Sequence, residues 1–141
     1  MINKELINAD VKTGDESEAR LKPRIESYLG INLAKLDKYN PFDFVDHKKN
    51  IYVEIKTINC VKGYYECVML GANKIAKALE HINNGYKIFL VFDLIDAPYI
   101  YEFTEKNFNS KNIRVSGRTD RGRDERKDYY FIHHLDLFHL K

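Results

Sequence analysis

The sequence predicts an α/β fold in which helices flank a mixed central β-sheet. Three observations carry this prediction. Two segments show helical periodicity, several others show strand patterns, and they follow one another in the order helix, hairpin, helix, strand, strand. The chain has no repeat, low-complexity tract or linker, so we expect residues 1–141 to form a single domain.

The first helix is expected over residues 15–29. One 3.6-residue stripe contains Glu18, Leu21, Ile25, Tyr28 and Leu29. Gly30 follows as a stop. Pro23 opposes a regular helix because it removes one backbone hydrogen bond, so we expect it to kink the helix or move its start.

Two runs rich in β-formers come next, at residues 42–45 and 51–58. The polar segment between them predicts a β-hairpin. A second helix is expected over residues 70–85, with Gly85 as its stop. Its apolar positions recur at i, i+3, i+4 and i+7, at Ile75, Ala78, Leu79 and Ile82.

The remaining elements follow from shorter patterns. Residues 86–94 form a nearly continuous apolar run, which is typical of a central strand covered on both faces. Residues 99–103 predict a further strand. A turn or short helix is expected over residues 107–115, and residues 129–140 fit a strand, a helix, or one after the other.

Composition predicts an intracellular, cytoplasmic protein, or one located in a host cell if the source is viral. No apolar run approaches the roughly 20 residues that span a bilayer, and the N-terminus lacks the apolar region of a signal peptide. We therefore expect no membrane partner. Cys60 and Cys67 are too few for a disulfide framework, and the histidines form no zinc signature.

Positive charge is concentrated in residues 111–127. This segment holds seven basic and three acidic residues, a net charge of +4, whereas the other sixteen basic and eighteen acidic residues sum to −2. A phosphate-binding loop and a solvated loop with internal ion pairs both fit this pattern. The candidate phosphate contacts in it are Arg118, Arg121, Arg123 and Arg126. Asn73 and Lys74, near the start of the second helix, form another candidate group, although a solvated Lys74 fits equally well.

Charges alternate with apolar side chains in the hairpin. Side chains alternate along a strand, so Glu54 and Lys56 share one face of the second run. If the hairpin closes around residues 47–50, Asp46 opposes Ile51 and Asp43 opposes Glu54, with their Cβ atoms about 5 Å apart. The opposite face would then carry the apolar side chains Phe42, Phe44, Val53 and Ile55.

Two adjacent carboxylates repel each other and need a compensating charge. A salt bridge to Lys56 would relieve one of them, whereas a divalent cation would relieve both, and oxygen ligands favour Mg²⁺. Lys56 would then lie beside the metal, where it could position a water or offset charge on a phosphate. Glu18, on the apolar stripe of the first helix, is a further candidate ligand. Complementing the helix dipole is its alternative role.

The pattern resembles the PD-(D/E)XK nuclease superfamily. The resemblance rests on Pro41 and Asp43 in "PFDF", on "VEIKT" with Glu54 and Lys56, and on a preceding helix with Glu18. It covers about residues 15–103. One departure is that Phe42 separates the proline from the aspartate.

The resemblance implies a restriction-endonuclease-like three-layer sandwich and a Mg²⁺-dependent deoxyribonuclease, with Mn²⁺ as a substitute metal. It implies that Asp43 and Glu54 bind the metal, with the Ile55 carbonyl and Glu18 as further ligands, and that Lys56 is the catalytic lysine. The compact Holliday-junction-resolvase-like branch is the most similar, and it suggests a structure-specific endonuclease and a homodimer by analogy of fold. A catalytically silent nucleic-acid-binding or assembly protein and an RNA nuclease remain as alternatives.

Overall fold

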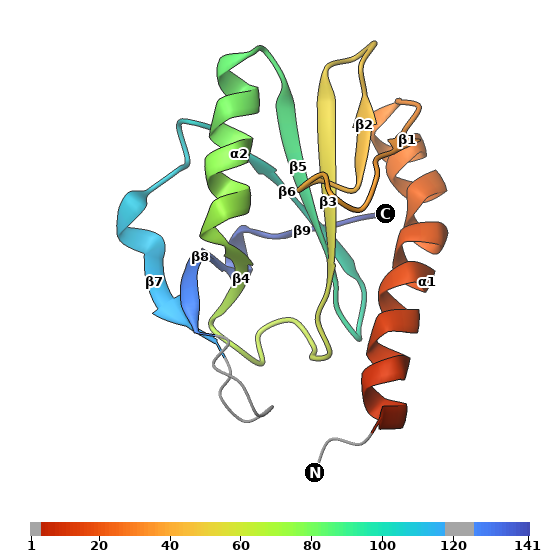
Figure 1. The fold of residues 1–141 in the computed structure, drawn as a ribbon, viewed down its shortest axis with the longest axis vertical. Helices are drawn as coiled ribbons and strands as arrows, with labels where there is room; N and C mark the ends of the chain where they lie inside the picture. Colours follow the sequence, from red (N-terminus) through yellow and green to blue (C-terminus); the bar gives the residue numbers. More distant parts are fainter. Residues whose placement is uncertain (1–3, 118–125) are drawn as a thin grey trace.

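The computed structural model describes residues 4–117 and 126–141, with side chains described from residue 14 onward. It confirms a mixed α/β protein, with two α-helices and two sheets in the described ranges (Figure 1). In chain order the elements are α1 Lys4–Leu29, β1 Ala34–Lys35, β2 Phe44–Asp46, β3 Ile51–Thr57, β4 Cys67–Gly71, α2 Ala72–Asn83, β5 Lys87–Asp93, β6 Pro98–Phe103, the 3₁₀ helix η1 Ser110–Asn112, β7 Ile113–Ser116, β8 Lys127–His133, the 3₁₀ helix η2 His134–Asp136 and β9 Phe138–His139. Neither α-helix is long and apolar enough to cross a bilayer.

Helix α1 begins well before its predicted start at residue 15. Pro23 lies inside it at an exposed position, where water can bond the carbonyl that the proline leaves unpaired, so the helix continues past it. Leu21 and Ile25 are fully buried, as the apolar stripe predicted, whereas Tyr28 is 47% exposed. Gly30 ends the helix with a φ of 67°, a conformation that glycine adopts easily.

The hairpin pairs Asp46 with Ile51, as predicted. The paired residues begin at Phe44, so the predicted pairing of Asp43 with Glu54 is not part of the ladder, and the Asp43 N–H bonds to the Val53 carbonyl instead. The prediction that Phe42 and Phe44 share a face is wrong. The Phe42 ring lies 5.5 Å from the Tyr52 ring in the apolar cluster beside α2, whereas Phe44 joins the cluster beside α1. The reason is that β2 begins only at Phe44, so the strict alternation of a strand does not extend back to Phe42.

Six strands form the main sheet in the order β1-β2-β3-β5-β6-β9. β3 and β5 are parallel, and α2 lies in the crossover between them, while the other neighbouring pairs are antiparallel. The predicted helix over residues 70–85 is confirmed, with Gly71 as its N-cap residue and a positive φ of 88° at Gly85 just beyond its end.

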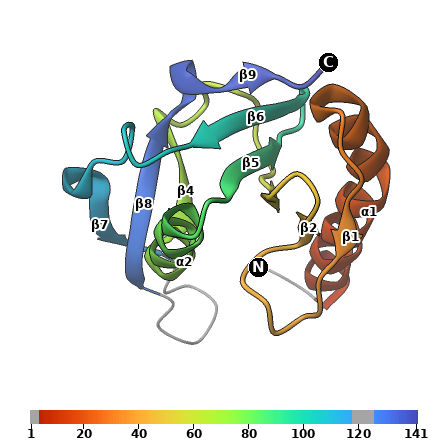
Figure 2. The same cartoon turned by 90° about the horizontal axis from the view of Figure 1, so that it is seen from above.

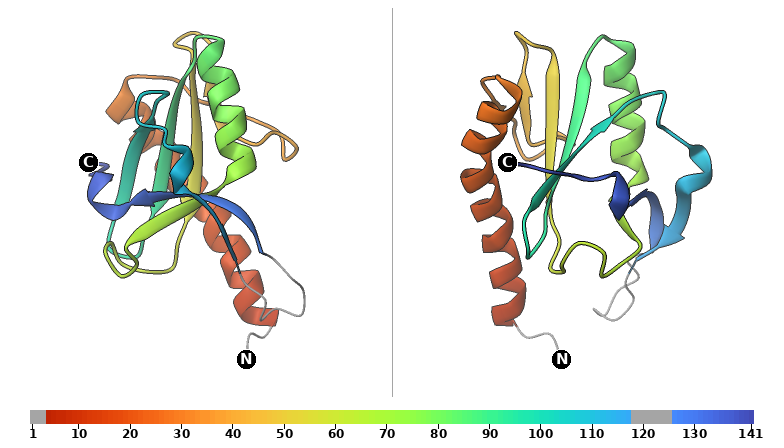
Figure 3. Two further views of the ribbon diagram at one scale, coloured as in Figure 1. Left: turned by 90° about the vertical axis from the view of Figure 1, so that its left-hand side faces the viewer. Right: turned by 180° about the vertical axis from the view of Figure 1, so that it is seen from behind.

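Both faces of the main sheet are covered, and β5 shows this most clearly. Its side chains alternate, so Leu90 and Phe92 enter the apolar cluster that includes Ile75 of α2, whereas Val91 enters the cluster that includes Leu21 of α1. Figures 2 and 3 show the two helices on opposite sides of these strands. The prediction of a doubly covered central strand over residues 86–94 is therefore confirmed.

A second sheet of three strands, β4-β8-β7, was not predicted. β4 leads directly into α2 and pairs with β8, with Gly71 opposite Tyr129 (Figure 1). The predicted turn or short helix over residues 107–115 becomes η1 followed by β7. Residues 129–140 contain most of β8, then η2 and β9, so a strand, a helical turn and a second strand follow one another.

Candidate active site

Asp43 lies immediately before β2 and is fixed against β3. Its backbone N–H donates to the Val53 carbonyl at 3.1 Å, and its carbonyl accepts from the Leu36 N–H at 2.9 Å. Its carboxylate Oδ2 accepts the Ile55 N–H at 2.7 Å. The side chain therefore takes the place of a backbone carbonyl as an acceptor at the edge of the ladder, which limits where this carboxylate can point.

Glu18 of α1 reaches the same region. Its side chain is 16% exposed, and Lys35 of β1 donates to its Oε2 at 2.9 Å. Burial raises the pKa of Glu18, the adjacent Asp43 carboxylate raises it further, and Lys35 partly offsets both. The structure thus brings Glu18 and Asp43 together, and their mutual repulsion is an unfavourable term.

Glu54 is the most deeply buried of the three carboxylates, at 2% exposure on the α2 side of β3. Its Oε2 contacts the ammonium group of Lys74, in the first turn of α2. Burial lowers the pKa of Lys74, while the nearby carboxylates Asp43 and Glu18 act in the opposite direction. Lys74 therefore lies within electrostatic reach of all three acidic side chains.

The Lys56 side chain reaches from β3 to β4 of the second sheet. Its Nζ donates to the Met69 carbonyl of β4 at 2.7 Å, so the ion pair with Glu54 is made by Lys74 instead. Burial lowers the pKa of Lys56. The neighbouring Ile55 contacts the site through its N–H, which bonds to Asp43.

The donor set fits a hard divalent cation in kind, because it consists of carboxylate oxygens. As arranged, the part of the chain described here has no group of three His, Cys, Asp or Glu side chains close enough to hold a metal ion. Lysines hold two of the carboxylates, Lys35 on Glu18 and Lys74 on Glu54. A cation would have to compete with these ammonium groups and draw the acidic side chains together.

The candidate nucleic-acid contacts are only partly described. Asn73 and Lys74 both lie in the first turn of α2, and Asn73 is exposed. Arg126 is exposed just before β8. The other three arginines predicted to contact phosphate, Arg118, Arg121 and Arg123, lie outside the described residues.

A buried polar network beside the site was missed by sequence reasoning. Asp93, at the end of β5, accepts hydrogen bonds from Ser17 and Arg20 of α1. Thr57, paired with Asp93 across the parallel strands, donates to the Ser17 hydroxyl at 2.9 Å. The network fixes the part of α1 that carries Glu18. Partners this far apart in sequence leave no local pattern by which to find them.

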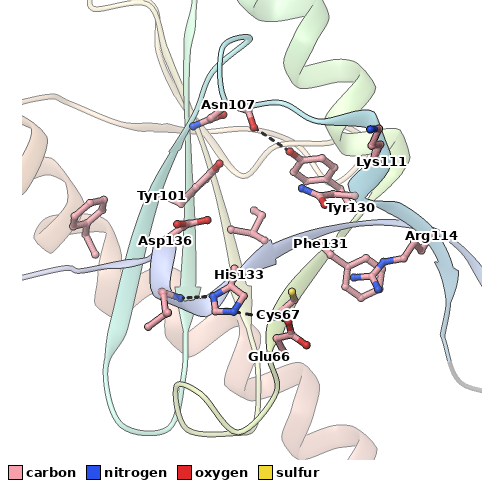
Figure 4. Close-up of a pocket in the computed structure, with 14 residues that line it drawn as sticks. Glu66, Cys67, Tyr101, Asn107, Lys111, Arg114, Tyr130, Phe131, His133 and Asp136 are labelled. Atoms are coloured by element: carbon pink, nitrogen blue, oxygen red, sulfur yellow. Dashed lines mark hydrogen bonds and ion pairs between the residues drawn. The ribbon is translucent and has the colours of Figure 1, made fainter.

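A hollow of about 690 Å³ lies away from these residues, between β6, β8 and η2. Figure 4 shows Tyr101, Asp136 and His133 around it. Volume alone would favour this hollow as the functional site. Chemistry favours the carboxylate region instead, because none of Glu18, Asp43, Glu54 or Lys56 lines the hollow.

Comparison with known proteins identifies one family. Residues 9–140 match a family model described as "Phage putative PDDEXK endonuclease". No curated protein matches the chain. The matched range includes every strand and most of α1, and it extends through the C-terminal segment that the resemblance in the sequence did not cover.

Proposed function

The chain belongs to this phage PDDEXK endonuclease family, a family of hydrolases, and on that premise we propose that it is a metal-dependent nuclease that hydrolyses phosphodiester bonds in DNA. The observation that carries the proposal is that one lysine lies within electrostatic reach of three acidic side chains from three elements. Glu18 comes from α1, Asp43 from the entry to β2 and Glu54 from β3, and Lys74 interacts with each. Neighbouring carboxylates repel one another, and a divalent cation offsets this repulsion more fully than the single charges of Lys35 and Lys74.

Asp43 and Glu54 would hold Mg²⁺ or Mn²⁺, with Glu18 and the Ile55 carbonyl as further ligands. When bound, such an ion neutralises charge on a phosphate and lowers the pKa of a coordinated water. The Ile55 N–H keeps the Asp43 carboxylate in place. The network around Asp93 supports Glu18 in the same way, through the adjacent Ser17.

Besides Lys35, which pairs with Glu18, two lysines supply positive charge near the carboxylates. Lys56 follows Glu54 by two residues on β3 and would orient a water or offset charge that develops on the phosphate. Its lowered pKa makes release of a proton from its ammonium group easier. Lys74, once released from Glu54, would contact the phosphate, and Asn73 at the exposed start of α2 would contact the same strand.

We further propose that residues 1–141 form one domain with the three-layer sandwich of restriction endonucleases. The helices on opposite faces of the main sheet support this proposal. We also propose that the protein is a structure-specific, resolvase-like nuclease, that it assembles as a homodimer and that it acts inside the cell. These proposals rest on likeness of fold and on composition.

A substrate panel tests the proposed function. Purified protein is offered duplex, single-stranded, flap and four-way DNA, and the same shapes in RNA, with Mg²⁺, with Mn²⁺ and with EDTA. We expect cleavage of at least one DNA substrate that requires the metal and is lost in the variants Asp43→Ala, Glu54→Ala and Lys56→Ala. Cleavage of RNA alone would identify an RNA nuclease, and no cleavage in any condition would overturn the proposal.

A catalytically silent nucleic-acid-binding protein is the second candidate. It is favoured by one observation: lysines already hold two of the three carboxylates, and no metal-holding group of side chains is formed in the described chain. Calorimetric titration with Mn²⁺ separates the two candidates. A nuclease should bind the ion and lose this binding in Asp43→Ala, whereas a silent protein should give no heat in either.

A further inference from the structure

The second sheet places a further lysine, Lys127, beside the candidate active site. β8 begins at Lys127 and pairs with β4 so that Tyr129 lies opposite Gly71, the residue that leads into α2. The Lys127 Nζ lies 3.6 Å from the point that a Cβ on Gly71 would occupy. Its ammonium group therefore lies beside the N-terminus of α2, the helix that carries Lys74.

Tyr129 links this lysine to β3. The Lys127 Nζ lies 5.3 Å from the centre of the Tyr129 ring, and the Lys56 Nζ lies 5.8 Å from it. Each contact is a cation–π interaction worth about 0.5–1 kcal/mol at a partly exposed site. The half-buried ring thus brings Lys127 close to Lys56, which lies near the C-terminal end of β3, two residues after Glu54.

Charge in this group is unbalanced. Lys74 has a carboxylate partner in Glu54, whereas Lys56 donates to the neutral Met69 carbonyl. Lys127 forms no ion pair with the residues that the structure describes. The ammonium groups of Lys127 and Lys56 lie against the same Tyr129 ring, so there is repulsion between their like charges. An anion bound among the three ammonium groups would relieve it.

We propose that Lys127 contacts a backbone phosphate of the DNA next to the bond that is cut, and that Tyr129 positions Lys127 and Lys56 for this contact. The inference rests on the proposed function and deepens it. It makes the start of β8, outside the range of the sequence resemblance, part of the substrate site. A phosphodiester is the anion that a nuclease site must hold, and lysines neutralise phosphates as point charges.

Salt dependence of binding tests the proposal. Affinity for a fluorescently labelled DNA duplex is measured by anisotropy in EDTA, at several salt concentrations, for the wild type and for Lys127→Gln. Loss of one phosphate contact should make the plot of log affinity against log salt shallower by about 0.9 for duplex DNA. Lys127→Arg should keep the wild-type slope, because it keeps the charge.

Lys87→Gln is the matched control. Lys87 is exposed at the start of β5, opposite Ile51, and so lies at the other end of these parallel strands from Lys56. It should keep the wild-type slope. Equal slopes for the wild type and Lys127→Gln, with both folded by circular dichroism, would overturn the inference.

The design separates this inference from the proposed function. If the wild type cuts DNA and the slope is independent of Lys127, the contact fails and the nuclease stands. If Lys127→Gln flattens the slope and the wild type cuts nothing, the phosphate contact stands and the nuclease fails. Tyr129→Leu should change the slope less than Lys127→Gln, since it removes a positioning ring and no charge; a larger change would contradict the role given to Tyr129.

Discussion

At the scale of single residues, the ion pair between Glu54 and Lys74 decides the electrostatics of the site. Glu54 is 2% exposed, and a charge buried this deeply is costly unless it is paired. Lys74 supplies the pairing charge from the neighbouring helix. A divalent cation at Glu54 would take over that task, so metal binding and this ion pair should oppose each other.

The variant Lys74→Met tests this opposition. Without metal it should lose about 1–3 kcal/mol of unfolding free energy, less than the loss of a fully buried partner, because the Lys74 side chain is 35% exposed. Mn²⁺ should then raise its melting temperature more than that of the wild type, since no ammonium group has to be displaced. Lys77→Met, on the exposed side of α2, is the control. Equal shifts with Mn²⁺ in all three proteins would contradict a metal at Glu54.

Strand alternation predicted the candidate acidic residues, but it could not predict their partners. Glu54 and Lys56 share a face because they are two residues apart on one strand. The contact of Glu54 with Lys74 depends instead on how α2 lies across β3. The position of Lys127 depends on a sheet formed by strands nearly sixty residues apart in the chain. Neither arrangement leaves a local signal in the sequence.

At the scale of elements, the attachment of α1 to the sheet determines where Glu18 lies. Buried apolar side chains hold the helix against the sheet, and the network of Ser17, Arg20 and Thr57 around Asp93 fixes it beside the ends of β3 and β5. Because Ser17 is adjacent to Glu18, loss of this network should shift a candidate metal ligand.

Asp93→Ala should lower the unfolding free energy by about 1–3 kcal/mol, because it removes the acceptor of the Ser17 hydroxyl in a buried setting. Urea denaturation measures this change. Arg20→Ala is the comparison: its side chain is 53% exposed, so its loss should cost no more than about 1 kcal/mol. An unchanged midpoint and slope for Asp93→Ala would show that the network does not hold the helix.

Long patterned elements were predictable from the sequence, and short ones were not. The second helix and β5 have strong periodicity or continuous apolar character, and both lie where they were expected. β1 has only two residues, both exposed, and exists through its pairing with β2. β4 runs into α2 with no intervening turn, so the start of the helix hides the strand.

At the scale of the whole molecule, the C-terminal segment completes the apolar core. Tyr130 and Ile132 of β8 are buried in the cluster beside α2, and Leu140 is buried in the cluster beside α1. The backbone of Leu140 is hydrogen-bonded at both ends. Its N–H donates to the Pro98 carbonyl at 3.0 Å, and its carbonyl accepts from the Arg24 side chain at 2.8 Å. The segment is therefore part of the fold.

Leu140→Ala should cost about 2–5 kcal/mol of unfolding free energy, because it leaves a cavity at a fully buried position. Phe138→Ala, two residues earlier and 69% exposed, should change stability by less than about 0.5 kcal/mol. Thermal unfolding of the two variants compares them directly. Similar melting temperatures would mean that the C-terminal residues are an appendage to the core.

A single-turnover cleavage rate on the best DNA of the panel, measured with Mg²⁺ and with EDTA, tests whether the carboxylates of the hairpin carry out metal-dependent cleavage. Asp43→Asn is compared with Asp46→Asn. Asp46 lies on the same hairpin, but its carboxylate accepts the backbone N–H groups of Lys48 and Lys49 in the turn and of Asn32 between α1 and β1. We predict a Mg²⁺-dependent wild-type rate that falls at least about 100-fold in Asp43→Asn and stays near the wild-type value in folded Asp46→Asn. A rate that persists in EDTA, or that Asp43→Asn leaves unchanged, would rule out metal-dependent cleavage at Asp43.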